Sequence, residues 1–252
     1  MAQKSEIEWT DATWNPVTGC TKVGAGCDNC YAERFAERWR GVIGHPYEQG
    51  FDLRLWPSRL EQPVRWRKPR MIFVNSMSDL FHKKVDRSFI DHVFDVMERA
   101  DWHVFQVLTK RSSLMRDFVR ARYEGGPVPR HIWLGVSVED SAHVNRISHL
   151  KAINSEARFI SFEPLLGLIP ELDLRGVAWA IVGGESGPGA RTMQPDWARK
   201  LRDICQRDNV EFFFKQWGGP RPKSNGRLLD DMEWNGFPKH AVPKSILDSL
   251  VT

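Results

Sequence analysis

Short apolar runs that end in polar residues recur along the chain between residues 71 and 217. The runs are Met71–Met77, Val104–Lys110, Ile132–Asp140, Arg158–Pro164, Trp179–Ser186 and Glu211–Trp217. Helical stretches lie between them at Ser88–Ala100, Ser112–Tyr123, Ala142–Ile153 and Asp196–Arg207. Continuous apolar runs are typical of strands buried in a parallel sheet, and their alternation with helices implies right-handed βαβ units. We therefore predict an α/β fold, a single TIM-like (β/α) barrel with parallel strands, complete or partial.

The stretch before residue 71 is expected to add one or two strands to this fold. Ile7–Val17 and Phe51–Leu55 have the pattern of short strands, and a helix is expected from Tyr31. The length of each strand–helix unit would also suit a doubly wound sheet. A chain of 252 residues is long enough for one barrel, and no linker or internal repeat divides it. We predict one domain over residues 1–252, with a short C-terminal extension at 218–252.

Composition bears on where the protein is found and on its charge, but it does not indicate a reaction. There is no run of 18 apolar residues, and the N-terminus lacks the apolar segment of a secretory signal, so we expect a cytoplasmic protein with no membrane span. The net charge of +4 and the isoelectric point near 8.9 are mildly basic. Such a charge permits a polyanionic partner without requiring one.

Three of the four cysteines lie within one loop, Gly19–Tyr31. Cys20, Cys27 and Cys30 form a C-x6-C-x2-C pattern, and thiolates are soft ligands that suit zinc or an iron–sulfur cluster. Three thiolates leave one coordination position open. We favour an iron–sulfur cluster with an open iron. A zinc site completed by a distant ligand such as His45, or a disulfide with a spare thiol, are the alternatives.

Polar residues cluster at the C-terminal ends of the predicted strands. In a parallel α/β fold this rim carries the functional residues, although every strand must also end in something polar. The rim residues are Asn75, Ser76, Ser78, Asp79, Thr109, Lys110, Arg111, Ser137, Glu139, Asp140, Glu163, Glu185, Ser186, Lys215 and Gln216.

The glycine-rich segment Val182–Arg191 follows one of these strands. A glycine turn exposes backbone N–H groups, so Glu185 could accept hydrogen bonds from an amino group while Arg191 pairs with a carboxylate. This pattern suits an amino-acid-like ligand, and the alternative is simply a tight loop. The segment does not match a dinucleotide fingerprint or a P-loop.

The segment Trp56–Arg70 combines two tryptophans with several arginines and a lysine. It predicts either a solvated basic surface or a surface that contacts phosphates.

These motifs carry two resemblances. The three cysteines, the aromatic Tyr31 and the Gly183–Glu185 segment resemble a radical S-adenosylmethionine (SAM) enzyme, with six residues instead of three in the first cysteine gap. A closer match covers nearly the whole chain: NPVTGCTKVGAGCDNCYAE, FVNSMSDLFH, FQVLTKR, LGVSVED, SFEPLLG, IVGGESGPGAR and FFKQWGG resemble a phage and prophage protein family of unknown function with an N-terminal three-cysteine motif.

The radical SAM resemblance implies a mechanism and a set of residues. Cys20, Cys27 and Cys30 would bind a [4Fe–4S] cluster whose open iron chelates SAM, and reductive cleavage would give a 5′-deoxyadenosyl radical. The enzyme would be a lyase or transferase, supplied with electrons by flavodoxin or ferredoxin. Its substrate would be DNA or a nucleotide, as for photoproduct lyases. The implied cofactor-binding residues are Ser137, Gly183, Gly184, Glu185, Arg191 and Gln216, and the implied catalytic residues are Lys110, Glu163 and Lys215.

Two other function classes compete with this prediction. One is a non-catalytic nucleic-acid-binding protein that carries zinc or a cluster and uses the basic, aromatic surface. The other is a metal-independent hydrolase on a barrel, with Glu163 and Glu185 as an acid/base pair, which leaves the three cysteines without a role.

Overall fold

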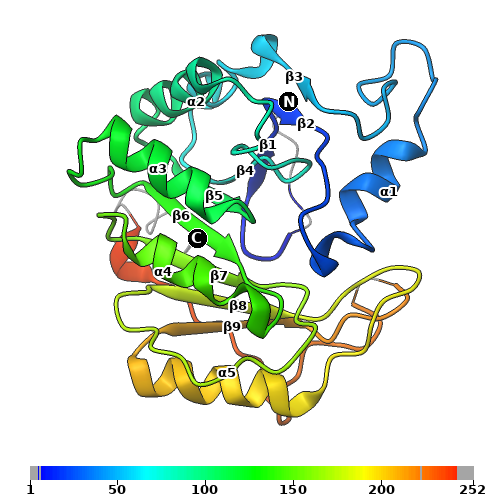
Figure 1. Ribbon diagram of the computed structural model, residues 1–252, viewed down its shortest axis with the longest axis vertical. Helices are drawn as coiled ribbons and strands as arrows, with labels where there is room; N and C mark the ends of the chain where they lie inside the picture. Colours follow the sequence, from blue (N-terminus) through cyan, green and yellow to red (C-terminus); the bar gives the residue numbers. More distant parts are fainter. Residues whose placement is uncertain (1–4, 6, 222, 243–252) are drawn as a thin grey trace.

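Seven parallel strands form one curled sheet in the computed structural model, which describes residues 5, 7–221 and 223–242 (Figure 1). Along the sheet the order is β1-β4-β5-β6-β7-β8-β9, the same as along the chain. The strands are Ala12–Trp14 (β1), Met71–Val74 (β4), Val104–Thr109 (β5), Ile132–Ser137 (β6), Arg158–Phe162 (β7), Trp179–Gly183 (β8) and Glu211–Gln216 (β9).

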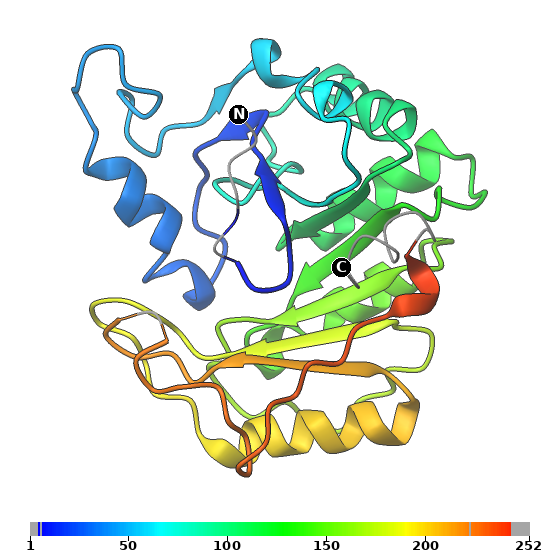
Figure 2. The same cartoon turned by 180° about the vertical axis from the view of Figure 1, so that it is seen from behind.

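This order confirms a partial barrel. Every neighbouring pair is parallel, and no strand order reversal of a doubly wound sheet occurs among the described strands. Within the same described part, β1 and β9 are the two edges and do not pair with each other, so a complete barrel is not formed. Figure 2 shows the resulting open, concave side of the sheet.

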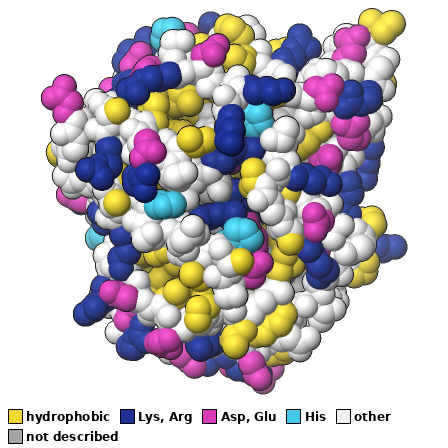
Figure 3. All heavy atoms as spheres, in the orientation of Figure 1, with side chains coloured by type: hydrophobic (Ala, Val, Ile, Leu, Met, Phe, Trp, Pro, Cys, Tyr) yellow, Lys and Arg dark blue, Asp and Glu magenta, His cyan; other side chains and the backbone are white. Residues whose placement is uncertain are grey.

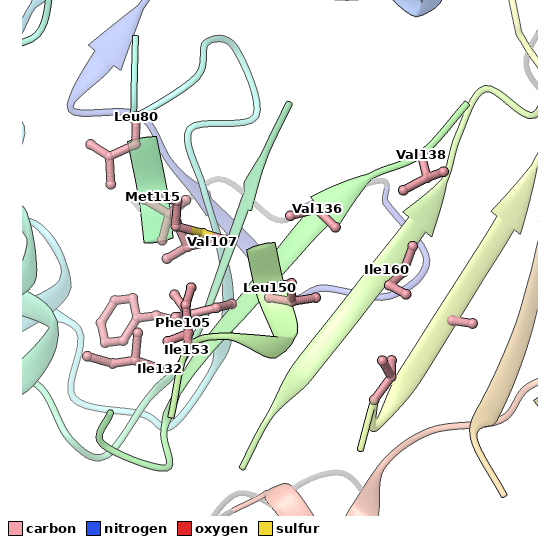
Figure 4. Close-up of a cluster of buried hydrophobic side chains, with 14 of the residues drawn as sticks. Leu80, Phe105, Val107, Met115, Ile132, Val136, Val138, Leu150, Ile153 and Ile160 are labelled. Atoms are coloured by element: carbon pink, nitrogen blue, oxygen red, sulfur yellow. The ribbon is translucent and has the colours of Figure 1, made fainter. Parts of the chain in front are cut away.

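The convex side of the sheet is covered by Arg87–Arg99 (α2), Ser112–Arg122 (α3), Asn145–Lys151 (α4) and Pro195–Asp208 (α5), which lie within a few residues of the predicted bounds. Tyr31–Glu37 (α1) lies apart from them, on the side of the C-terminal strand ends (Figure 1). Each of α2, α3 and α5 has an apolar stripe with helical spacing, for example Phe89, Val93 and Met97 on α2. The stripes pack on the sheet to form the larger core, part of which is drawn in Figure 4.

The N-terminal strands differ from the prediction. The single strand expected over Ile7–Val17 is two elements, β1 and Val17–Thr18 (β2), and the strand expected over Phe51–Leu55 is only Arg54–Leu55 (β3). Pro16 separates β1 from β2, because proline has no N–H to donate to a ladder. β2 and β3 pair antiparallel as a small second sheet.

A second, aromatic core fills the N-terminal half of the concave side. It contains Trp9, which precedes β1, and the strand residues Trp133, Phe159, Trp179 and Phe213, which alternate along their strands with residues of the larger core. The ring of Phe159 lies where a side chain at Gly135 would be, since an added Cβ there would collide with it. This core is the floor of the concave side.

The C-terminal extension runs along β9 and then under this floor. Phe214 N donates to Trp234 O and Gly236 N to Phe212 O, both at 2.9 Å. The indole of Trp179 donates to Gly236 O at 2.8 Å, so residues 234–242 cover the N-terminal end of the concave side. The predicted end of the extension, residues 243–252, lies outside the described residues, and the single domain over 1–252 stays a prediction.

The helix-covered face is a mixed charged surface, with Lys and Arg interspersed among Asp and Glu (Figure 3). Arg122 on α3, for example, pairs with Asp91, Asp95 and Glu98 on α2. No helix in the described ranges has the length and apolar character needed to cross a membrane.

Candidate functional site

Two ion pairs stand above the aromatic floor, at the C-terminal ends of the strands. Lys215 on β9 binds Glu163, just after β7, with 2.8 Å between Nζ and Oε1. Ser161 Oγ donates to the other oxygen of Glu163 at 3.2 Å. The intervening strand contributes Gly183, whose added Cβ would lie 2.8 Å from Glu163 Oε1. Gly183 therefore leaves the space in which Glu163 and Lys215 meet.

The second pair joins Lys110, after β5, to Glu139, after β6. Arg146 on α4 also binds Glu139, at 2.8 Å, and the Glu139 side chain is buried. Burial raises the pKa of Glu139, but the charges of Lys110 and Arg146 outweigh it and hold the pKa below its usual value. The structure thus brings together two of the three predicted catalytic residues, Glu163 and Lys215, and gives the third, Lys110, a separate partner.

Arg111 holds the beginning of the cysteine loop. Its guanidinium donates to Asp79 Oδ2 at 3.0 Å, to the carbonyl of Thr21 at 2.9 Å and to Cys20 Sγ at 3.5 Å. Arg111 and Asp79 are both buried. Burial raises the pKa of the Cys20 thiol and Asp79 raises it further, while Arg111 acts in the opposite direction.

Four side chains hold the end of the cysteine loop to the segment after β8; we call them the loop clasp: Asn29, Arg34, Glu185 and Arg191. Glu185 Oε1 binds Arg191 at 2.5 Å, and Glu185 Oε2 accepts from Asn29 at 2.9 Å. Arg191 donates to the carbonyl of Ala25 at 2.8 Å, and Arg34 to that of Pro188 at 2.6 Å. Burial raises the pKa of Glu185, but these hydrogen bonds dominate and lower it to about 2.

The middle of the loop rests on residues that follow β6. An added Cβ at Gly26 would lie 2.5 Å from Glu139 Cγ, and one at Gly24 would lie 3.0 Å from His143 Nε2. The first residue of α1, Tyr31, donates its hydroxyl to Ser76 O, after β4, at 2.5 Å. The loop is therefore held against the ends of β4, β5, β6 and β8, across the mouth of the partial barrel (Figure 2).

The cysteine loop offers three free thiols as metal ligands, and the choice between an iron–sulfur cluster and zinc stays a prediction. Cys20, Cys27 and Cys30 are unpaired thiols, each partly exposed, while Cys205 is buried in the core. Over the described ranges, no three His, Cys, Asp or Glu side chains converge to hold one metal ion. His45, the zinc ligand considered above, stacks on Trp39 with ring centroids 4.1 Å apart.

Several predicted cofactor residues have partners within the protein. Gln216 donates to Ser186 Oγ at 2.5 Å and accepts from Lys223 N at 3.1 Å. A Cβ at Gly184 would collide with the carbonyl of Trp217, so this glycine allows the backbones after β8 and β9 to approach. Ser137 is buried at the end of β6. Contact of these residues with SAM stays a prediction.

Glu185 and Arg191 bind each other in the structure, and Arg191 also binds the cysteine loop. Contact of these two side chains with an amino-acid-like ligand stays a prediction.

A family model described as "Protein of unknown function (DUF5131)" matches residues 4–238 of the sequence. The chain belongs to the DUF5131 family. No curated protein matches it.

Solved structures of spore photoproduct lyase are similar to this DUF5131 protein. A mutant with bound AdoMet and dinucleoside spore photoproduct has 12% identity and a TM-score of 0.46, over 82% of this chain and 63% of that one. A complex with the dinucleoside spore photoproduct has 12% identity and a TM-score of 0.44, over 82% and 64%. The DUF5131 chain thus spans less than two thirds of the length of these first two relatives.

Sequence reasoning missed part of the site in this DUF5131 protein. Asn29 and Arg34 were not singled out, and their partners Glu185 and Pro188 lie more than 150 residues away in the sequence. Nothing in the local sequence marks them, because an asparagine in a loop and an arginine on a short helix are both ordinary. Asp79 and Glu139 were marked only as rim residues, and their position in the strand-end pattern was the signal that could be read.

Proposed function

We propose that this protein is a radical SAM-type iron–sulfur enzyme that acts on DNA or a nucleotide, as a lyase or transferase. The observation that carries the proposal is the position of the cysteine loop. Three unpaired thiols lie on one loop that Arg111 and the loop clasp hold across the mouth of a partial barrel. Cytoplasmic localisation, a phage or prophage origin and an electron donor such as flavodoxin or ferredoxin belong to the same proposal.

Cys20, Cys27 and Cys30 would hold the cluster, and thiolates without carboxylates are the donor set of such clusters. Bound there with SAM, the cluster would supply the one-electron chemistry that yields a 5′-deoxyadenosyl radical. The protein's own task is placement. Arg111 brings a positive charge within 3.5 Å of Cys20 Sγ, where it offsets the negative charge of a thiolate.

The residues of the mouth would bind the substrate and the rest of SAM. Lys215 and Glu163 form a pair that can hold a proton between an ammonium and a carboxylate, and Lys110 adds a second cation beside Glu139. Ser137, Gly183 and Gly184 lie close to these pairs on the strand ends. The aromatic floor closes the other end of the concave side and keeps water from approaching the site from below.

Metal and sulfide analysis of anaerobically purified protein tests the proposal. About four irons and four sulfides per chain, with broad absorbance near ~400 nm, are expected for a [4Fe–4S] cluster. Cys27→Ala should lose them, and Cys205→Ala, at a buried thiol remote from the loop, should keep them. Reductive cleavage of SAM to 5′-deoxyadenosine is the next expected result. Stoichiometric zinc without sulfide would overturn the proposal and favour a zinc-containing binding protein.

A further inference from the structure

A run of basic side chains extends from β3 through two short 3-10 helices to the start of β4. We call it the basic strip: Arg54, Arg59, Arg65, Arg67, Lys68 and Arg70. The only carboxylate in this stretch of sequence, Glu61, pairs with Arg99 on α2. None of the six pairs with a carboxylate in the part of the chain that the structure describes, although most other arginines there, such as Arg122 and Arg207, do. The basic strip therefore carries positive charge that the protein itself does not balance.

The arginines of the strip are held on tryptophan rings. The guanidinium carbons of Arg54 and Arg59 lie over Trp56, 3.9 and 4.0 Å from the ring centroid, and Arg70 lies 5.6 Å from that of Trp66. Stacking fixes the planar guanidinium groups before any partner arrives, which lowers the entropy lost on binding. Burial without an anion lowers the pKa of Arg59. An external anion beside Arg59 would stabilise its charged form and offset the unfavourable effect of burial.

One end of the strip lies beside the cysteine loop. Arg54 is opposite Thr18 in the β2–β3 pair, and the Trp56 indole donates to Thr18 Oγ1 at 2.8 Å. Thr18 precedes Cys20 by two residues, so the Arg54–Trp56–Arg59 stack adjoins the site. From there the strip passes the edge strand β1, where the Trp14 indole donates to Arg59 O, and it ends at the N-terminal side of β4 and β5, where Val104 N donates to Arg70 O. A long partner bound along the strip can reach the mouth from its Arg54 end.

We propose that the basic strip binds the phosphates of duplex DNA and places it against the mouth of the partial barrel. This deepens the function proposed above by assigning a polymeric substrate rather than a free nucleotide. Proteins that bind single strands offer free aromatic faces on which bases stack. Here two guanidinium groups stack on Trp56, so the surface presents positive charge at this ring, which suits the phosphates of a duplex. A base would then leave the stack to enter the mouth.

The test is the salt dependence of binding to a fluorescein-labelled duplex of about 20 base pairs, measured by anisotropy. Each lost phosphate contact lowers the slope of log affinity against log salt by about 0.9. Arg65→Gln/Arg67→Gln should therefore reduce the slope by about 2 and weaken binding about tenfold or more near 0.1 M salt. Arg54→Gln, which removes one arginine instead of two, should reduce the slope by about half as much as the double variant.

The matched control is Arg116→Gln/Arg175→Gln, which removes the same charge from two arginines that pair with Asp117 and Asp173. It should leave the slope unchanged. The proposal would be overturned if the control lowered the slope as much as the strip variant does, or if the strip variant left the slope unchanged. Tighter binding of single-stranded DNA or of duplex RNA than of duplex DNA would also overturn it. Iron content is measured on the same samples. If wild-type protein without a cluster still binds duplex DNA through the basic strip, the enzyme proposal is refuted and the strip proposal stands. If the protein holds a cluster but does not bind duplex DNA, the strip proposal is refuted and the enzyme proposal stands.

Discussion

The carboxylate of Glu185 offers a sharp test of how the cysteine loop is held. Its side chain is 4% exposed and accepts hydrogen bonds from Arg191 and Asn29. We expect Glu185→Gln to destabilise the protein, because the amide keeps the shape of the carboxylate but loses the charge that Arg191 binds. The loop between Cys20 and Cys30 should also become more sensitive to proteolysis.

The magnitude follows from the lowered pKa. A change from 4.5 to about 2 corresponds to about 3 kcal/mol at neutral pH, at 1.36 kcal/mol per unit. Arg191 is 36% exposed, so solvent screens part of this, and we expect about 2 kcal/mol. Because the folded pKa is depressed, the contribution is fully present above about pH 5. It is lost progressively as the pH falls through 4.5 toward about 2.

The assay is urea denaturation of wild type and Glu185→Gln at several pH values between about 7 and 3. The difference in unfolding free energy should shrink as the pH falls below about 5, because the carboxylate becomes protonated in the unfolded wild type, whereas the glutamine of the variant does not titrate. The control is Glu61→Gln, the same chemical change in a pair whose two side chains are about half exposed, where the expected cost is below about 1 kcal/mol. A difference at Glu185 that is near zero, or that stays constant with pH, would refute the reasoning.

Two other perturbations follow from the packing of the site. Arg111→Gln should cost about 3–5 kcal/mol in urea denaturation, because it leaves the Asp79 carboxylate buried without its cation; the argument fails if the variant has wild-type stability. Gly135→Ala should cost about 1–3 kcal/mol, since the new methyl collides with Phe159. Gly167→Ala, with 3.5 Å to its nearest neighbour, is the control, and equal melting temperatures for the two variants would contradict the prediction.

The repeating part of the fold was readable because its pattern is local. All six predicted strands from Met71 onward contain an observed strand, and the four helices between them lie close to their expected bounds. A buried strand needs a continuous apolar run, and a helix that packs on a sheet needs apolar residues at helical spacing. Both patterns can be seen in the sequence. No local sequence pattern indicates whether the barrel closes. Closure depends on whether β1 meets β9, a contact between the two ends of the sheet.

The residue types of the candidate site could be predicted from the sequence, but the contacts between them could not. The cysteines, Glu163 and Lys215 could be singled out by residue type and by their places at strand ends. The role of Glu185 could not, because a carboxylate in a glycine-rich segment suits a ligand and an arginine equally well. Only the fold brings Asn29 to it, and only the fold separates His45 from the three thiols.

The loop clasp has a consequence for the order of events in biosynthesis. Residues 20–30 are synthesised before Arg191, yet Ala25 is held by Arg191, 166 residues later in the chain. Contacts of such long sequence separation form late in folding, after most of the sheet has assembled. The cysteine loop therefore reaches its final arrangement only after Arg191 has been synthesised. A product that ends before Arg191 would lack the loop clasp, and in the proposed enzyme it would not present the finished cluster site.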